Sequence, residues 1–207
     1  LSDSDFDMDD QNTDFFAVGK KVRIALADMD YISWLEDLKH DQMILAGVLR
    51  GIESITPEHD EKLLKLKQLI EDKLANPINK NNKKIIIFSA FADTVQYLYS
   101  QLSGVIQESY GLHTAMITGT NGSKTTVPRL HTDLNTILTC FSPVSKEKHL
   151  IMPEEKSEID LLIATDCISE GQNLQDCDFL INYDIHWNPV RIIQRFGRID
   201  RIGSKNE

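Results

Sequence analysis

Four short apolar runs, separated by segments with helical patterns, constrain the fold of this chain more than any other feature. The runs cover residues 84–89, 114–118, 160–164 and 179–183. Short continuous apolar runs bounded by turn signals are typical of strands that are buried on both faces of a sheet. Because helical patterns alternate with these runs, the sequence predicts a parallel α/β sheet flanked by helices.

The sequence predicts the helices between these strands less clearly than it predicts the strands. Residues 93–102 have helical periodicity, and 190–196 should open a helix after the last strand. Between 119 and 159 we expect a helix at 127–138, followed by loops where prolines interrupt the pattern.

Polar residues follow the predicted strands at their carboxyl ends. They are Ser89, Thr118 with Gly119, Thr165 with Asp166, and Asp184. Ligands of open parallel sheets bind beyond the carboxyl ends of the strands. The sequence therefore predicts that these residues share one ligand-binding edge.

The N-terminal part of the chain differs from this pattern. We expect an acidic linker at 1–20, a helical extension at 21–80 and the α/β domain at 81–207. The alternating aspartates near the start do not fit a calcium loop, because Met8 stands where such a loop needs glycine. A mobile acidic linker is the better interpretation.

Two helices are predicted within the extension. Apolar residues recur with helical spacing from Tyr31 to about Ser54, with Trp34 as an expected core anchor. Thr56-Pro57 is typical of the start of a second helix, which should end at about Ala75. We expect both helices to pack on the α/β domain or on a partner lobe; the alternative is a surface for another protein.

Composition excludes several classes of protein. The chain has 207 residues, 41% apolar and 26% charged, and no apolar run reaches the roughly 18 residues of a membrane span. The three cysteines and six histidines are scattered, which favours a reducing compartment and argues against a disulfide framework or a metal site. We therefore expect a cytoplasmic protein. Because the first residue is Leu1 and not Met, we also expect a piece of a longer chain.

The charge is distributed unevenly. A net charge of −10 at first argues against nucleic-acid binding. However, residues 1–80 hold 17 acids and 10 bases, whereas 191–207 hold five bases and two acids. Positive charge is thus concentrated near the end of the chain.

Three arginines near this end have a regular spacing. Arg195, Arg198 and Arg201 lie three residues apart, so a helix or helix-like turn keeps their guanidinium groups close together. Gly197 leaves room for another surface to approach. Converging guanidinium groups suit a polyphosphate, because each pairs with two phosphate oxygens. The alternative is a solvated basic helix face that pairs with Asp200.

A second segment with polar side chains follows the third predicted strand. In residues 165–174, the hydroxyl groups of Thr165 and Ser169 and the backbone at Gly171 can approach phosphate oxygens. The alternative is a capped helix start followed by a turn.

Taken together, these segments resemble the second RecA-like domain of superfamily 2 helicases and translocases. They are most similar to the Swi/Snf-related ATPases, in particular the bacterial branch that includes the RNA-polymerase recycling ATPase. The resemblance covers about residues 83–204 and rests on five segments. These are 84–89 (motif IV), 116–119, 164–174 (motif V), the Asp184…Trp187-Asn188-Pro189 connector and 194–203 (motif VI).

The resemblance implies a role for each matching residue. Arg198 and Arg201 would be arginine fingers that reach an ATP bound, with Mg²⁺, mainly by an N-terminal RecA-like lobe. Gln194 and Arg195 would orient these fingers. Gly171 and Asn173 would lie near the nucleotide. The residues implied to contact nucleic acid, expected to be duplex DNA, are Ser89, Thr118, Gly119, Thr165 and Trp187.

The phosphate-gripping half of such an enzyme is absent from the sequence. The segment 119–125 resembles a P-loop, but its glycines are too close together, so we interpret it as a surface turn. Asp60-Glu61 falls at a helix start and not after a strand, so it is not a Walker B pair. Cys167 has no base beside it in sequence and is expected to be a small buried side chain. We therefore expect the chain alone to hydrolyse ATP poorly or not at all.

Two other functions remain open. One is the motor of a strand-separating helicase or of a restriction or defence system, which differs in the domains attached to the motor. The other is a non-catalytic RecA-like scaffold that binds nucleic acid or protein. The arginine triplet argues against the scaffold, and the acidic net charge argues for it.

Overall fold

The computed structural model describes residues 17–18, 24–119, 122–168, 172–185, 188–200 and 206. By its internal contacts the chain divides into two units, residues 1–56 and 57–207. Each unit is described by itself.

A five-stranded sheet forms the centre of the second unit. Its strands are β3 (Ile85–Phe88), β4 (Thr114–Ile117), β5 (Ser123–Thr125), β6 (Leu161–Ala164) and β7 (Leu180–Asn182). They lie in the order β5-β4-β6-β3-β7, and all pairs are parallel except β4 with β5. The four predicted strands and the parallel α/β class are therefore confirmed.

The short strand β5 corrects one expectation. Its residues belong to the segment 119–125 that we interpreted as a surface turn. The chain reverses direction beside Gly122, which has a φ of 73°, and Ser123–Thr125 then pairs antiparallel with β4. A positive φ is readily adopted only by glycine, so this residue permits the tight return.

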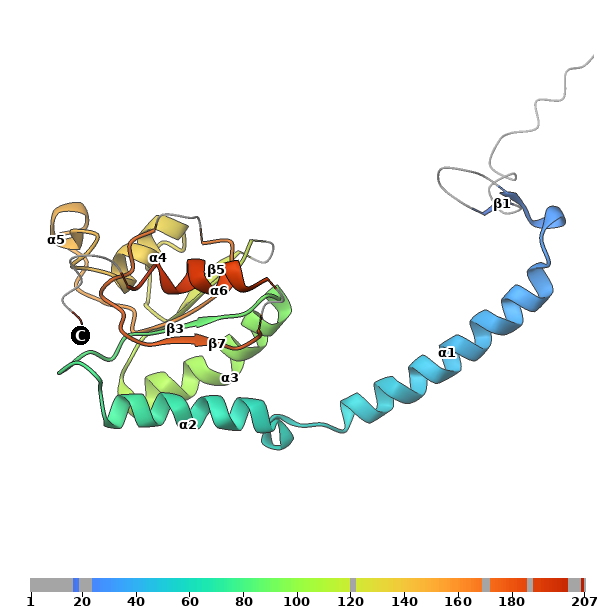
Figure 1. Cartoon of the computed structure of the whole chain (residues 1–207), viewed down its shortest axis with the longest axis horizontal. Helices are drawn as coiled ribbons and strands as arrows, with labels where there is room; N and C mark the ends of the chain where they lie inside the picture. The colour runs from blue at the N-terminus through green and yellow to red at the C-terminus, as the bar shows by residue number, and fades with distance from the viewer. Residues whose placement is uncertain are drawn as a thin grey trace, which may run out of the picture. The chain divides into compact units, whose positions relative to one another are not determined.

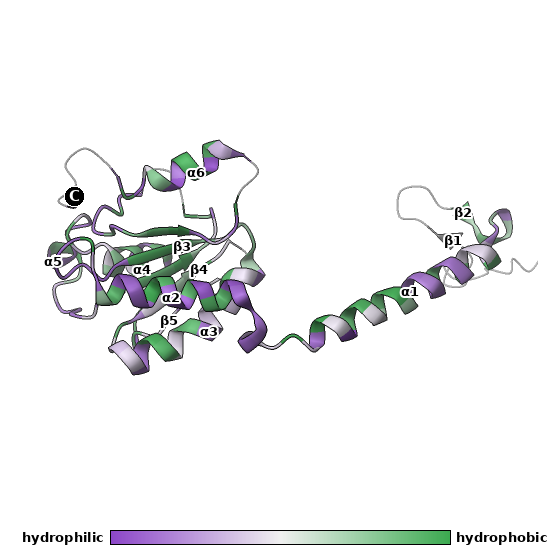
Figure 2. Cartoon of the chain, turned by 60° about the horizontal axis from the view of Figure 1, so that its bottom comes forward, coloured by the Kyte–Doolittle hydropathy of each residue, from purple (hydrophilic) through white to green (hydrophobic). Residues whose placement is uncertain are grey.

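Helices cover both faces of the sheet (Figure 1). α2 (Glu61–Ala75) and α3 (Ala92–Tyr110) lie on one face; α4 (Leu134–Phe141) and α6 (Pro189–Phe196) lie on the other. α5 (Lys148–Ile151) is a single turn near the end of α4. Side chains alternate along β3, so that Ile85 and Ile87 face α2 and α3, while Ile86 and Phe88 face α4. Burial on both sides explains why the strands are continuous apolar runs, and Figure 2 shows this apolar layer.

α4 begins later than the pattern predicts. We expected a helix at 127–138, and the helix runs from Leu134 to Phe141, with Asp133 as its N-cap. Val127 is buried in the core without being helical, so its apolar character reflects packing of a loop. Hydrophobic pattern alone does not distinguish these two cases over short segments.

The domain boundary also needs correction. We expected the α/β domain to begin at residue 81, but α2 packs directly on the sheet through Leu63, Leu66 and Ile70. The compact unit therefore begins at Pro57. A 3-10 turn begins at Pro57, as the Thr56-Pro57 pattern predicted, and runs to His59. The α-helix itself begins only after Asp60, whose side chain accepts a hydrogen bond from Leu63 N.

This boundary leads to a testable expectation. Leu66→Ala should destabilise the α/β unit by roughly 2–5 kcal/mol, because a buried leucine is lost and leaves a cavity. Leu64→Ala on the same helix should have a much smaller effect, since Leu64 is 46% exposed and Leu66 is 1% exposed. Urea unfolding followed by circular dichroism measures both. Equal effects would show that α2 is not part of the domain core.

The first unit is small. It contains a hairpin of β1 (Ala17–Val18) and β2 (Ile24–Ala25), a 3-10 turn (Leu26–Asp28) and α1 (Tyr31–Glu53). The predicted helix at 31–54 is confirmed. Within the first unit none of the residues of this helix is buried, and Trp34 is 40% exposed, so Trp34 is not a core anchor of this unit. Most of the predicted acidic linker lies outside the described residues. No described helix is long and apolar enough to cross a membrane.

Candidate nucleotide and nucleic-acid site

The carboxyl ends of the parallel strands bring the predicted polar residues to one edge of the sheet. Ser89 follows β3, Thr118 follows β4, Thr165 and Asp166 follow β6, and Asp184 follows β7. Because β4, β6, β3 and β7 are neighbours in that order, these residues lie in adjacent loops. This edge is the candidate site.

Arg195 links three parts of this edge. Its Nε and Nη2 donate to the two carboxylate oxygens of Asp166, both at 2.7 Å, and Nη1 donates to Asn182 Oδ1 at 2.8 Å. The guanidinium carbon lies 5.2 Å from the centre of the Phe88 ring. Arg195 is 0% exposed. We call these four residues the Arg195 clasp; it ties α6 to the loop after β6 and to the end of β7.

The clasp uses the geometry that distinguishes arginine from lysine. The planar fork of the guanidinium pairs with both oxygens of one carboxylate, which a lysine cannot do. The sequence indicated that Arg195 would orient neighbouring residues, and the contact with Asp166 gives it an anchor. It did not indicate the partner, because Asp166 and Arg195 are 29 residues apart.

Arg198 lies just beyond α6 and is buried. It is only 4% exposed, and its backbone oxygen accepts a hydrogen bond from Leu174 N at 3.1 Å. We had expected a side chain that projects toward a partner lobe. Since the guanidinium is covered, contact with a nucleotide requires movement of the groups around it. Gln194 is half-buried on α6.

Other residues that the resemblance implicated are placed as follows. Asn173 is half-buried, and its Oδ1 accepts a hydrogen bond from Gln175 N at 3.2 Å. Arg201, Gly171 and Trp187 lie outside the described residues.

The three hydroxyl residues at the edge are largely buried. Ser89 is 0% exposed, Thr118 6% and Thr165 9%. The hydroxyl group of Ser89 donates to Asp184 and accepts from Phe91 N, while Thr118 Oγ1 donates to Gly122 O at 3.1 Å. These hydroxyl groups therefore hold the edge loops in place.

The exposed surface of the edge is formed by different residues. Gly119 and Cys167 are both exposed and lie close together: a Cβ atom on Gly119 would be 3.4 Å from Cys167 Cβ. We expected Cys167 to be buried, and this was wrong. β6 ends at Ala164, and Cys167 lies in the loop that follows it.

Lys62 of α2 also reaches this edge, and sequence reasoning missed it. Its Nζ lies 2.9 Å from Asp184 Oδ1 and 3.9 Å from the centre of the Tyr183 ring. Partial burial raises the pKa of Asp184, but the hydrogen bonds from Ser89 and Lys62 outweigh this, and the net pKa is lowered. Burial raises the pKa of Tyr183 to about 12, with a further contribution from Asp60. No local pattern could have revealed a contact between residues 122 positions apart.

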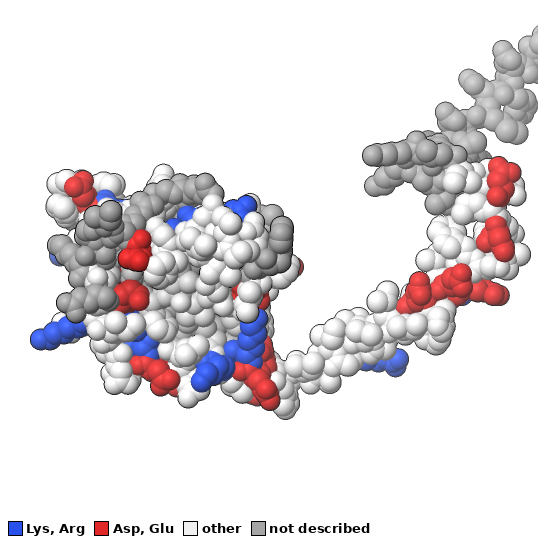
Figure 3. Space-filling model, viewed as in Figure 1, with Lys and Arg blue, Asp and Glu red and all other residues white. Residues whose placement is uncertain are grey.

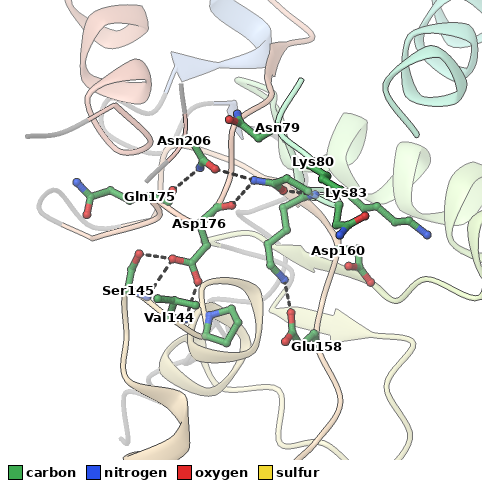
Figure 4. Close-up of a pocket in the computed structure, with 14 residues that line it drawn as sticks. Asn79, Lys80, Lys83, Val144, Ser145, Glu158, Asp160, Gln175, Asp176 and Asn206 are labelled. Atoms are coloured by element: carbon green, nitrogen blue, oxygen red, sulfur yellow. Dashed lines mark hydrogen bonds and ion pairs between the residues drawn. The ribbon is translucent and has the colours of Figure 1, made fainter. Parts of the chain in front are cut away.

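Two hollows lie away from these residues. A cavity of about 620 Å³ lies at the amino end of β3, opposite Ser89 (Figure 4). Two of its charged groups have partners in the lining: Lys84 Nζ lies 2.8 Å from Glu158 Oε2, and Asp176 accepts the amides of Val144 and Ser145. Lys80, Lys83 and Asp160 also line the cavity. An apolar groove of about 550 Å³ runs between β7 and α6, on a face that Figure 3 shows as largely uncharged. None of the predicted site residues that the structure describes lines either hollow.

The described residues contain no cluster of three or more histidine, cysteine, aspartate or glutamate side chains that could hold a metal ion.

Comparisons with curated proteins give relatives that match over part of their length. The chain is 50% identical over 52 residues to the uncharacterized ATP-dependent helicase YqhH of Bacillus subtilis, which covers 25% of this chain and 9% of that protein. It is 28% identical over 147 residues to the probable ATP-dependent RNA helicase ddx51 of Dictyostelium discoideum, covering 70% of this chain and 23% of that protein. The chain thus spans less than a quarter of the length of these relatives.

Solved helicase and ATPase structures are also similar. The C-terminal part of the Fun30 ATPase domain matches with a TM-score of 0.46 and 20% identity, covering 70% of this chain and 38% of that chain. The Hef helicase domain of Pyrococcus furiosus matches with a TM-score of 0.38 and 25% identity, covering 66% and 23% respectively.

One protein-family model matches most of the chain. The model of the helicase conserved C-terminal domain matches residues 61–203, which begins at the first residue of α2 and includes the whole candidate edge. The chain therefore belongs to the helicase conserved C-terminal domain family.

Proposed function

We propose that this chain is the C-terminal lobe of an ATP-dependent DNA translocase or helicase of superfamily 2, of the Swi/Snf-like type, acting in the cytoplasm. The Arg195 clasp is the observation that carries the proposal. It holds the segment with the arginines against the loop after β6, at the carboxyl edge of the sheet. A motor needs the arginine-bearing segment and the loop after β6 to keep a fixed position relative to each other, because the nucleotide and the nucleic acid would both bind beside them.

In this proposal, ATP lies between this lobe and an N-terminal RecA-like lobe that supplies the phosphate-binding loop. Arg198 and Arg201 would stabilise negative charge on the transferring phosphoryl group, and Gln194 and Arg195 would position them. Gly171 and Asn173 would lie near the nucleotide. Mg²⁺ would be bound mainly by the partner lobe, beside the phosphate-binding loop.

The nucleic acid would lie on the exposed part of the edge. Gly119 supports this because it is exposed and has no side chain, so a phosphate backbone could approach closely. Thr118, Thr165 and Ser89 would act mainly by holding the loops, since their hydroxyl groups are already engaged. Trp187 would contact the strand beside them. Backbone contacts of this kind hold register without reading sequence.

The burial of Arg198 favours a second candidate, a non-catalytic scaffold that binds nucleic acid or protein. The buried position of the Arg198 guanidinium can be explained without a bound nucleotide. A net charge of −10 also suits a protein partner better than a nucleic acid. A restriction or defence motor remains a variant of the first proposal with other attached domains.

The ATPase activity of a two-lobe protein separates these candidates. We expect this chain, joined to its N-terminal lobe, to hydrolyse ATP faster when duplex DNA is added. The chain by itself should show no turnover above background. Parallel assays with single-stranded DNA and RNA would identify the preferred nucleic acid. A two-lobe protein without ATPase activity on any of them would favour the scaffold.

A further inference from the structure

We infer that Lys62 is a positioning residue: through Asp184, it holds the connector that leads from β7 to the arginine-bearing helix α6. The inference rests on the proposed function. It concerns a residue of α2 outside all the motif-like segments.

Each carboxylate oxygen of Asp184 is held by a different element. Oδ1 pairs with Lys62 Nζ of α2 at 2.9 Å, and Oδ2 accepts the hydroxyl group of Ser89, just after β3. These partners are 122 and 95 residues away in sequence. Asp184 is therefore held by α2 and by the residue that follows β3, two parts of the domain that lie outside the connector.

The position of Asp184 makes this contact relevant to α6. Asn188, the N-cap of α6, lies four residues further on, and its Oδ1 accepts a hydrogen bond from Val190 N at 3.0 Å. The other end of α6 is held by the Arg195 clasp. Lys62 and Ser89 thus hold Asp184 on the chain before α6, and Asp166 holds α6 near its end.

Lys62 is itself on a rigid support. Its neighbour Leu63 is 0% exposed and packs in the core, and the N-cap Asp60 accepts a hydrogen bond from Tyr97 of α3 at 3.0 Å. The ammonium group also lies over the Tyr183 ring, at a distance typical of a cation–π contact. The anchor therefore has a defined direction, which a mobile surface lysine lacks.

A positional role predicts a particular pattern of effects. The side chain of Lys62 is 54% exposed, and an exposed ion pair adds little to folding stability. A small displacement of a catalytic group, in contrast, can lower a rate by about 100-fold. Loss of Lys62 should therefore lower the rate of the chemical step more than it lowers stability or ATP binding.

The experiment compares three variants of the two-lobe protein. Lys62→Ala should lower kcat of the nucleic-acid-stimulated ATPase by about tenfold and leave KM for ATP within about twofold of wild type. Lys62→Arg should restore most of kcat, because it keeps the charge and can stack on Tyr183. Lys65→Ala is the matched control: Lys65 is exposed on the same helix, and its ammonium group contacts Gln68 at 3.0 Å.

A second readout does not depend on catalysis. In Lys62→Ala, amide hydrogen exchange should become faster in peptides that cover 183–198, and it should stay unchanged in Lys65→Ala. If Lys62→Ala matches Lys65→Ala in both kcat and exchange, the inference is wrong. Equal loss of activity in Lys62→Ala and Lys62→Arg would also overturn it. An inactive wild-type protein would count against the proposed function alone, since the exchange experiment would still test the contact.

Discussion

Replacing Arg198 by alanine in the two-lobe protein should lower the nucleic-acid-stimulated ATPase rate by about 10³-fold or more, the range of a lost arginine finger. The proposed reason is that a guanidinium stabilises charge that develops on the phosphoryl group only in the transition state. KM for ATP should change far less than kcat, because the interaction is weak in the ground state.

The control for Arg198→Ala is Arg191→Ala. Arg191 lies on α6, the helix that precedes Arg198, and carries the same charge, but it is exposed, whereas Arg198 is buried. Thermal unfolding of each variant checks that the lobe still folds. If Arg198→Ala keeps its activity within a few-fold of wild type, Arg198 is a structural residue and the finger role is rejected. The experiment distinguishes a catalytic from a structural role for Arg198, whose side chain is covered in the structure.

Asp166→Ala should destabilise the α/β unit by about 3–5 kcal/mol, the usual effect of removing one partner from a buried ion pair. The substitution leaves the guanidinium of Arg195, which is 0% exposed, without the carboxylate that receives two of its hydrogen bonds. A buried charge without its partner is costly, whereas a missing surface charge is not. Urea unfolding of the chain provides the measurement.

Two further variants make the Asp166 test specific. Glu108→Ala removes an exposed carboxylate from α3 and should change the free energy of unfolding by less than about 0.5 kcal/mol. Asp166→Ala combined with Arg195→Met should be more stable than Asp166→Ala alone, because the buried charge is gone. If the double variant is no more stable than the single one, the clasp does not act through its charges.

The elements that sequence predicted best are those whose pattern follows directly from burial. The strands β3, β4 and β6 are buried on both faces, so they had to be continuous apolar runs, whereas the edge strand β7 is half-buried. The ends of all four strands agree with the predictions within one or two residues. The placement of polar residues at one edge then followed from parallel strands alone.

Predictions failed where two local patterns were equally good. Thr56-Pro57 and Asp60 are both good helix starts: a 3-10 turn begins at Pro57, whereas α2, which packs Leu63 in the core, begins after Asp60. Val127 is apolar because a loop fills the core, which a helical pattern resembles over a short stretch. The side chain of Cys167 is exposed in the loop after β6, and a single cysteine carries no sequence pattern that would indicate its exposure.

By itself, the sequence determined the α/β class, the strands of the sheet and the edge at which its polar residues gather, because these depend on local burial and chain direction. Only the tertiary structure decided that Arg195 holds Asp166, that Lys62 holds Asp184 and that Arg198 is covered. The physical reason is that these contacts join residues whose distance in space depends on strand order and helix packing, which the spacing of residues along the chain does not record.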